Sequence, residues 1–355
     1  MKRLISLDVL RGITVFGMIL VNNGVGHQQF STLQHAEWNG LTPCDLVFPF
    51  FLFMVGVSIY LSLKKFNFTP TPKLVGKILR RTAILFLMGM LLHAWDMMIW
   101  SEPDILANIR VWSVLGRIAL CYGIVSLLML WVGYRHLWKI VLGLLILYSA
   151  ILILGNGYAQ DDTNLACIID RALCGEAHLY HKSPVDPEGL LGTISSVAHT
   201  IIGVMVGKAI SEKKSVKERI FGVLLIASLI GVAGYLLSYG FPLNKRIWSP
   251  SYVLVTCSLA ASMLGLLTYV IDEKGHSKCF TFFRAFGVNA FFMYVLSEAL
   301  ASIMWYFNVP GTVFDSVNSL INCPEWSSAI YALLFDASLG LIALLMWKMK
   351  WMVKI

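Results

Sequence analysis

Long apolar runs separated by short polar segments make up most of the chain. Ten of these runs approach the roughly 20 apolar residues that a helix needs to cross a hydrocarbon core of ~30 Å. The expected spans are 12–26, 45–63, 82–100, 111–133, 139–155, 190–210, 220–240, 251–271, 286–307 and 328–347. The pattern predicts an all-α, polytopic membrane bundle of about ten transmembrane helices, with eleven as the upper alternative.

The composition agrees with this pattern, since 57% of the residues are hydrophobic and only 14% are charged. No internal repeat, linker or low-complexity tract divides the sequence, so we expect one transmembrane domain over 1–355. With no room for a separate soluble catalytic domain, any chemistry must use side chains on the helices and at their ends.

Positive charge is distributed unevenly along the chain. Most of its 28 Lys and Arg residues fall in alternate loops, chiefly 64–81, 208–219 and 274–284, which places those loops and the N-terminus in the cytoplasm. The opposite loops hold few cations: Arg110, Arg171, Lys182, Lys245 and Arg246. Topology and anionic lipid headgroups therefore account for the net charge of +8, and no nucleic-acid partner is expected.

The N-terminal apolar run is expected to be a retained helix. It follows Lys2 and Arg3, contains Asn22 and Asn23, and lacks a small-residue cleavage site. On the outer face, 156–189 and 308–327 are expected to be the two long loops. Cys167 and Cys174 share the first of them, which leaves a disulfide open.

No metal site is expected. The seven cysteines form no CxxC pair. His178 with His181, and His93 with Asp96, have helical spacing, but neither pair has further ligands nearby.

A polar segment beside an apolar run, 34–50, carries the parts of an acid/base site. His35 is a proton acceptor near neutral pH, and Asp45 could orient it. Thr42 and Pro43 also make this a typical helix start, so Asp45 is either a cap, a partner of His35, or both. Trp38 is either an interfacial anchor or a platform for a sugar ring.

Six blocks resemble one known family in the same order. They are RLISLDVLRG (3–12), HAEWNGLTPCDLVFPF (35–50), NIRVWSVLGR (108–117), IDRALCGEAHLY (169–180), VDPEGLLGTI (185–194) and PLNKRIWS (242–249). They resemble the catalytic domain of heparan-alpha-glucosaminide N-acetyltransferase, in the transmembrane acyltransferase superfamily. The resemblance spans most of the chain.

The resemblance implies a vectorial reaction. Acetyl-CoA would be the cytosolic donor, and an amino sugar of the glucosamine type would be the acceptor across the membrane. The family's catalytic histidine corresponds to His35, and its nearby asparagine to Asn22, with Asn23 as a competing match. Glu188 becomes a candidate for substrate binding through the same resemblance, although Asp186 and Pro187 also read as a helix start.

Acyl transfer from a thioester to an amine needs a base and donors for the oxyanion. His35 could act as the base or take the acetyl group itself as an acyl-imidazole. The side-chain amides of Asn22 and Asn39 are candidate oxyanion donors. Arg110 and Arg117, seven residues apart, are expected on one helix face as substrate contacts or structural ion pairs. Arg117 would need a buried partner such as Glu298 or Asp336.

The CoA end must rely on cations of the inner face, because no phosphate-binding glycine loop is present. The candidates are Arg11, Arg80, Arg81 and Arg284, with Asn289 for the pantetheine amides, although positive-inside anchoring also explains the arginines. Charged CoA cannot cross the membrane, so vestibules from both sides should meet at a narrow point. Gly56, Pro49, Gly203 and Gly207 would allow close packing around this passage.

Two other functions remain open. An envelope O-acyltransferase would share the acyl-CoA chemistry and the opening with Asp8 and Arg11, and an amino-sugar permease would share the buried polar residues. Because the sequence lacks the long N-terminal extension of the lysosomal enzyme, a bacterial inner-membrane location is expected. A homodimer is left open.

Overall fold

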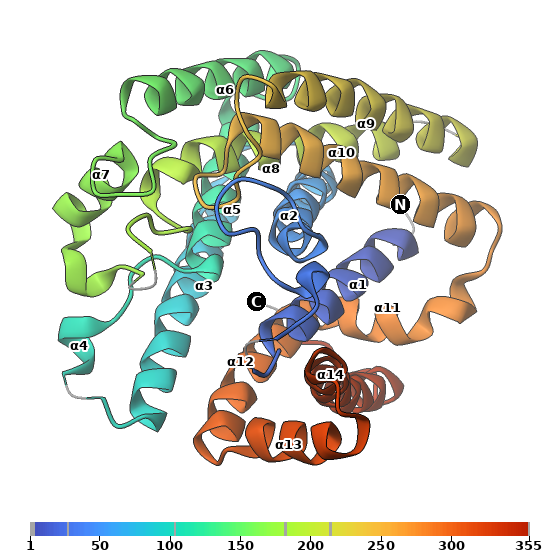
Figure 1. The fold of residues 1–355 in the computed structure, drawn as a ribbon. Coiled ribbons are helices and arrows are strands. Elements are labelled where there is room, and N and C mark those ends of the chain that lie inside the picture. The colour runs from blue at the N-terminus through green and yellow to red at the C-terminus, as the bar shows by residue number, and fades with distance from the viewer. Residues whose placement is uncertain (1–3, 27, 103, 181–182, 213–214, 354–355) are drawn as a thin grey trace.

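A helical bundle is seen in the computed structural model, which describes residues 4–26, 28–102, 104–180, 183–212 and 215–353 (Figure 1). Several residues used in the charge and metal arguments lie outside the described ranges: Lys2, Arg3, His181, Lys182, Lys213 and Lys214. No strand occurs within those ranges.

The long helices are α1 (Ile5–Asn22), α2 (Val47–Leu63), α3 (Pro72–Ile99), α5 (Val114–Trp131), α6 (Leu137–Leu154), α8 (Leu190–Glu212), α9 (Val216–Ser238), α10 (Pro250–Leu267), α12 (Ala290–Tyr306) and α14 (Pro324–Lys348). The shorter helices are α4 (Ile105–Asn108), α7 (Leu165–Cys174), α11 (Thr281–Val288) and α13 (Val309–Ile321). The short turns are η1 (Ser31–Leu33), η2 (Pro43–Leu46), η3 (Lys64–Phe66), η4 (Glu176–His178), the π-helical η5 (Thr268–Glu273) and η6 (Ser277–Phe280).

The prediction of a polytopic membrane bundle is confirmed. Over the described residues, nine helices are long and apolar enough to span a membrane. A tenth span results if α11 and α12, bent by 69° on either side of Asn289, are counted together.

Two predicted span starts were too late by seven residues or more. α1 begins at Ile5 rather than at residue 12, because Asp8 and Arg11 pair inside the helix at 3.3 Å instead of marking its boundary. α3 begins at Pro72 rather than at residue 82. Thr71 caps this start, because its hydroxyl accepts from the backbone N–H of Leu74. Both helices extend beyond their apolar parts because charged side chains near their ends are tolerated there.

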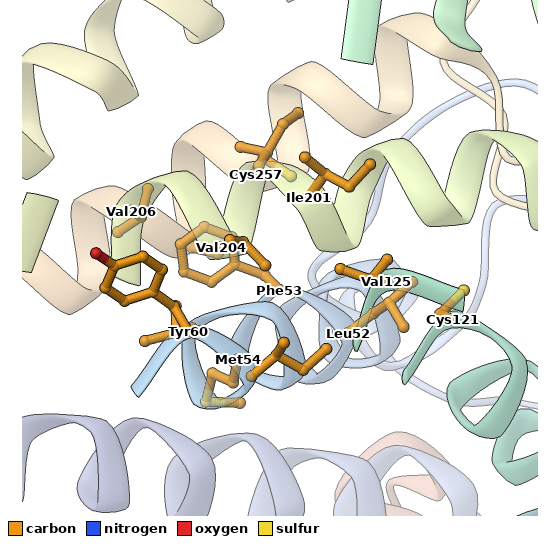
Figure 2. Packing of buried hydrophobic residues seen from close by; sticks show 14 of the residues in the cluster. Leu52, Phe53, Met54, Tyr60, Cys121, Val125, Ile201, Val204, Val206 and Cys257 are labelled. Atoms are coloured by element: carbon orange, nitrogen blue, oxygen red, sulfur yellow. The ribbon is translucent and has the colours of Figure 1, made fainter. Parts of the chain in front are cut away.

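Helix α2 runs through the middle of the bundle (Figure 1), where it packs closely on α8. A Cβ on Gly56 would lie 2.0 Å from the carbonyl oxygen of Thr200, and one on Gly203 would lie 2.2 Å from that of Phe53. Figure 2 shows the apolar side chains around this contact: Leu52, Phe53, Tyr60, Ile201, Val204 and Cys257. The expected close packing at these glycines is therefore confirmed.

The two long loops expected on the outer face contain helices that the sequence did not predict. α7 lies in the first, and α13 occupies most of 308–327. Both are short amphipathic helices and therefore fail a search for long apolar runs. Cys167 and Cys174, at opposite ends of α7, are both free thiols.

The bundle has two ends of different character. We call one the basic end, where Arg11, Lys64 and Arg81 lie near the starts of α1 and α3 and the end of α2. The other is the His35 end, formed by 23–26 and 28–46, by the segment between α9 and α10, and by residues 183–189 before α8. The 17 residues of α2 separate the two ends by about 25 Å.

Candidate active site

His35 and Asp45 form the expected pair. The His35 Nδ1–H donates to Asp45 Oδ1 at 2.7 Å, because an ionised carboxylate can only accept. The Asp45 side chain is 1% exposed, whereas that of His35 is 49% exposed. The carboxylate thus orients an imidazole that is itself half exposed.

Asp45 is a helix cap and a histidine partner at the same time. Its Oδ2 accepts from the backbone N–H groups of Thr42 and Ala36, both at 3.1 Å, and from the Thr42 hydroxyl. The reciprocal contacts between Thr42 and Asp45 form a capping box at η2. Asp45 is therefore both the helix cap and the partner of His35: Oδ2 serves the cap, and Oδ1 accepts from His35.

The segment before α10 closes over this pair. Gly40 N–H donates to the Leu243 carbonyl at 2.7 Å, and Asn244 Nδ2 donates to Asn39 Oδ1 at 3.1 Å. Lys245 brings its Nζ to 3.0 Å from His35 Nδ1 and 3.6 Å from Asp45 Oδ1. Burial lowers the pKa of Lys245, and the nearby Asp45 carboxylate opposes that shift.

A second charged cluster lies at the same end. Arg110 donates through Nε and Nη2 to both oxygens of Asp186, and through Nη2 to Glu188 at 2.6 Å. Its guanidinium lies 4.7 Å from the ring centre of Tyr180. Burial alone would lower the pKa of Arg110, but the carboxylates of Glu188 and Asp186 outweigh it and raise that pKa.

The expected common helix face for Arg110 and Arg117 was wrong. α5 begins at Val114, so Arg110 lies in the extended segment before it, and Arg117 lies in the first turns of the helix. Ser113 caps the helix there by accepting from Gly116 N–H, which fixes the start between the two arginines.

Arg117 is buried but does not pair with Glu298 or Asp336. Its Nη2 donates to the carbonyl of Gly189 at 2.7 Å, and its guanidinium lies 5.2 Å from the ring centre of Trp248. Glu298 instead accepts from Asn22. A backbone carbonyl and an aromatic face thus replace the expected carboxylate partner.

Helix α8 begins at Leu190, as the predicted span 190–210 has it, but Asp186 and Pro187 do not form its start. Asp186 holds a turn by accepting from Glu188 N–H, and α8 itself begins at Leu190. The first N–H of the helix, that of Leu190, donates to Asp170 Oδ1 on α7 at 2.9 Å. Burial raises the pKa of Asp170 to about 6.

Asn22 and Trp38 have hydrogen-bond partners other than the His35 imidazole within the part of the chain that the structure describes. Asn22 Nδ2 donates to Glu298 at 3.2 Å, and the competing Asn23 donates to the carbonyl of Ile19. Trp38 Nε1 donates to the carbonyl of Tyr158 at 3.0 Å, which fastens the His35 loop to the 155–164 segment. Asn39 is joined to the group through Asn244.

A cavity of about 400 Å³ opens at the basic end, within the size range of small-molecule and cofactor sites. Three of the five CoA candidates line it: Arg11, Arg81 and Asn289. Arg11 donates to Ser58 at 3.0 Å on the cavity wall. Most of the apolar part of the wall comes from α2, α5 and α12, with Leu85 of α3, Val288 of α11 and Val353 completing it.

The other two CoA candidates are not in this wall. Arg80 is exposed on α3, whereas the next residue, Arg81, reaches the cavity and lies 4.7 Å from the ring centre of Tyr122. Arg284 lies against Trp347, 4.7 Å from its ring centre. Consecutive residues on a helix point about 100° apart, so Arg81 faces the cavity while its neighbour Arg80 does not.

A smaller void of about 20 Å³ continues the cavity towards the His35 end. Both voids are lined by Phe51, Leu115, Ile118 and Phe291, and the smaller one also reaches Phe48. Their walls together follow α2 from Ser62 to Phe48, about 21 Å of its length. Phe48 is three residues from Asp45, so the void ends about one helical turn from the carboxylate partner of His35.

Known proteins are similar to this chain. The catalytic-region model of heparan-alpha-glucosaminide N-acetyltransferase matches residues 3–171. The heparan-alpha-glucosaminide N-acetyltransferase of Homo sapiens is 32% identical over 358 residues, and that of Mus musculus is 30% identical over 361. The chain belongs to this family. The alignments cover 83% and 84% of the chain but 53% and 54% of those proteins, so the chain spans about half the length of the curated relatives it matches.

Four residues at the His35 end were not predicted from the sequence as members of the site: Lys245, Asp186, Asp170 and Cys44. Cys44 lies 3.1 Å from His35 Nδ1 through its Sγ. A signal for Lys245 was available, since a lysine in an outer loop departs from the positive-inside pattern. For the metal candidates, His178 donates to the Ile109 carbonyl, and no cluster of three metal-ligating side chains occurs within the described ranges.

Proposed function

We propose that this protein transfers the acetyl group of acetyl-CoA, bound at the basic end, to the amine of a glucosamine-type sugar at the His35 end. The observation that carries the proposal is the line of voids along α2, which begins between Arg11 and Arg81 and ends one turn from Asp45. The membership in the N-acetyltransferase family supports the reaction class.

At the His35 end, the Nδ1–H bond to Asp45 leaves Nε2 as the base. The amine attacks the thioester carbonyl, the C–N bond forms, and His35 removes the amine proton. Collapse of the tetrahedral intermediate breaks the C–S bond and releases CoA as thiolate. The alternative route, in which His35 itself is acetylated first, uses the same nitrogen and would give a labelled protein when the acceptor is omitted.

At the basic end, Arg11 and Arg81 would meet the CoA phosphates, and the apolar wall would hold the pantetheine arm. Asn289 is partly engaged already, since its Nδ2 donates to the Trp351 carbonyl and its Oδ1 accepts from Val353 N–H. The C-terminal segment therefore lies against the cavity wall through Asn289.

The acceptor would be bound by the charged groups of the outer segments. Asp186 and Glu188 provide carboxylates for a sugar ammonium or hydroxyls, and Arg110 holds both in place. Trp38 and Asn39, in the same loop as His35, would be further contacts for the acceptor.

The test is transfer of labelled acetyl from acetyl-CoA to glucosamine by the purified protein, compared with His35→Ala. We expect an amide product that survives mild base and is lost in the variant. A base-labile ester product would identify an envelope O-acyltransferase. Uptake of intact sugar without acetyl-CoA, and no acetyl product, would identify a permease. The bacterial inner membrane and a homodimer stay predictions.

A further inference from the structure

Lys245 occupies an unusual position relative to the candidate base. Its Nζ lies 3.0 Å from His35 Nδ1 and 3.1 Å from Nε2. Because Nζ is nearly equidistant from both ring nitrogens, it lies over the face of the imidazole. A position in the ring plane at the same two distances would overlap the Cε1 atom between the nitrogens. The ammonium therefore uses neither in-plane nitrogen position, and Nε2 keeps its lone pair for a substrate proton.

The surrounding segments hold this ammonium in place. Asn244 donates through Nδ2 to Asn39, and its backbone N–H donates to the Ser249 hydroxyl at 3.0 Å. The Lys245 side chain is only 17% exposed. Because most of the side chain is buried, the ammonium cannot swing out into solvent and stays beside His35.

The three N–H donors of Lys245 are incompletely used. Asp45 Oδ1, 3.6 Å away, is an ion-pair partner for one of them, and no carbonyl or other carboxylate in the described part of the chain lies within hydrogen-bond distance of Nζ. At least one N–H can therefore turn to a ligand atom beside His35.

We propose that Lys245 is a catalytic residue that holds the oxyanion formed when the amine attacks the acetyl carbonyl. The inference rests on the proposed function. An amine nitrogen within hydrogen-bond reach of His35 Nε2 places the attacked carbonyl beside the ring, where Nζ is 3.1 Å from the same nitrogen. The oxyanion accepts from the ammonium, His35 takes the amine proton, and the C–S electron pair leaves with CoA.

This assignment replaces the asparagine amides expected from the sequence. Asn22 Nδ2 donates to Glu298, whereas Asn39 accepts from Asn244 through Oδ1 and offers only a neutral amide donor. A charged donor in a partly buried site stabilises a developing negative charge more strongly than a neutral amide does.

The test compares the purified wild-type chain with Lys245→Met and Lys245→Arg, and with the matched control Arg246→Met. Arg246 is the adjacent cation and contacts no member of the His35 group in the described residues. For Lys245→Met we expect kcat to fall about 10²–10³-fold while the KM for acetyl-CoA changes less than about 3-fold, because an oxyanion contact acts in the transition state. Arg246→Met should retain wild-type kcat.

The pH profile distinguishes a catalytic ammonium from a structural one. Lys245 faces His35 of the loop before η2, Cys44 and Asp45 of η2, and Glu188 before α8. The wild-type kcat should decline at alkaline pH as Lys245 loses its proton, and Lys245→Arg should lose that decline because arginine stays charged. Thermal unfolding of each variant checks the fold.

Each outcome decides one question. Wild-type activity with an unchanged kcat in Lys245→Met would overturn the role of Lys245 and leave the proposed function intact. A Lys245→Met variant that raises only the KM for the sugar would overturn the oxyanion role as well. A wild-type protein that transfers no acetyl group would overturn the proposed function and this inference with it.

Discussion

The two ends of the bundle hold their charges in different ways. At the His35 end, side chains from segments far apart in the sequence meet within hydrogen-bond distance, as in the contacts of Lys245 with His35 and of Arg110 with Asp186. At the basic end, Arg11 and Arg81 stand in the wall of a cavity of about 400 Å³. The first arrangement fixes chemical groups, and the second leaves space for a large ligand.

This difference is what a transfer between two compartments requires. Preorganised groups lower the barrier of a chemical step, because they need no rearrangement when charge develops. A roomy cavity with cations in its wall suits a bulky, multiply charged donor that must enter and leave. Helix α2 joins the two ends, since it carries Asp45 just before its first turn and Ser62 in the cavity wall.

The largest effect is expected at the His35 end. Asp45→Asn should lower kcat about 10³–10⁴-fold, because an amide no longer fixes the Nδ1–H tautomer of His35. Steady-state kinetics with acetyl-CoA and glucosamine measures this change. Glu37→Gln, which removes an exposed carboxylate of the same loop, should have little effect. Equal losses in both variants would remove the special role of Asp45.

The connection between the ends depends on the close approach of α2 and α8. Gly56→Ala places a methyl group about 2.0 Å from the Thr200 carbonyl oxygen, so it should destabilise the fold by about 1–3 kcal/mol. Gly143→Ala on α6 meets nothing within 4 Å and serves as the control. Thermal unfolding in detergent measures both. A variant at Gly56 as stable as the control would contradict the packing described.

Asp170 should make the stability of the His35 end depend on pH. Burial raises its folded-state pKa to about 6, above its ordinary value of 3.8, so its contribution is full below pH ~4 and is lost as pH rises through 6. The difference corresponds to about 3 kcal/mol. Unfolding temperatures from pH 4 to 7 should therefore fall more steeply for the wild type than for Asp170→Asn. The exposed control Asp315→Asn should follow the wild type, and an equally steep Asp170→Asn curve would contradict the assignment.

The smallest effect is expected at the basic end, where binding is shared among several groups. Arg81→Ala should weaken acetyl-CoA binding about 10-fold through the loss of one phosphate contact, with kcat nearly unchanged. Arg80→Ala removes a neighbouring charge that points away from the cavity and should leave binding unaltered. Isothermal titration with acetyl-CoA separates the two. Equal weakening would indicate a general charge effect rather than a site.

The sequence predicted the features that depend on composition and local order. Long apolar runs marked the spans, and the Thr42–Asp45 helix start and the His35–Asp45 pair were both anticipated. The contacts that depend on packing were missed. Lys245 meets His35 only because the Gly40–Leu243 backbone bond joins two distant segments, and Arg117 found a carbonyl and an indole face rather than a carboxylate.

The central claim is that the acetyl group passes from the basic end to the His35 end through the membrane. The most direct measurement traps labelled acetyl-CoA inside vesicles containing the protein and supplies glucosamine bound to an impermeant polymer outside. The account predicts labelled amide on the external polymer, abolished by His35→Ala. Product formed only when acetyl-CoA and the polymer share one compartment would contradict it.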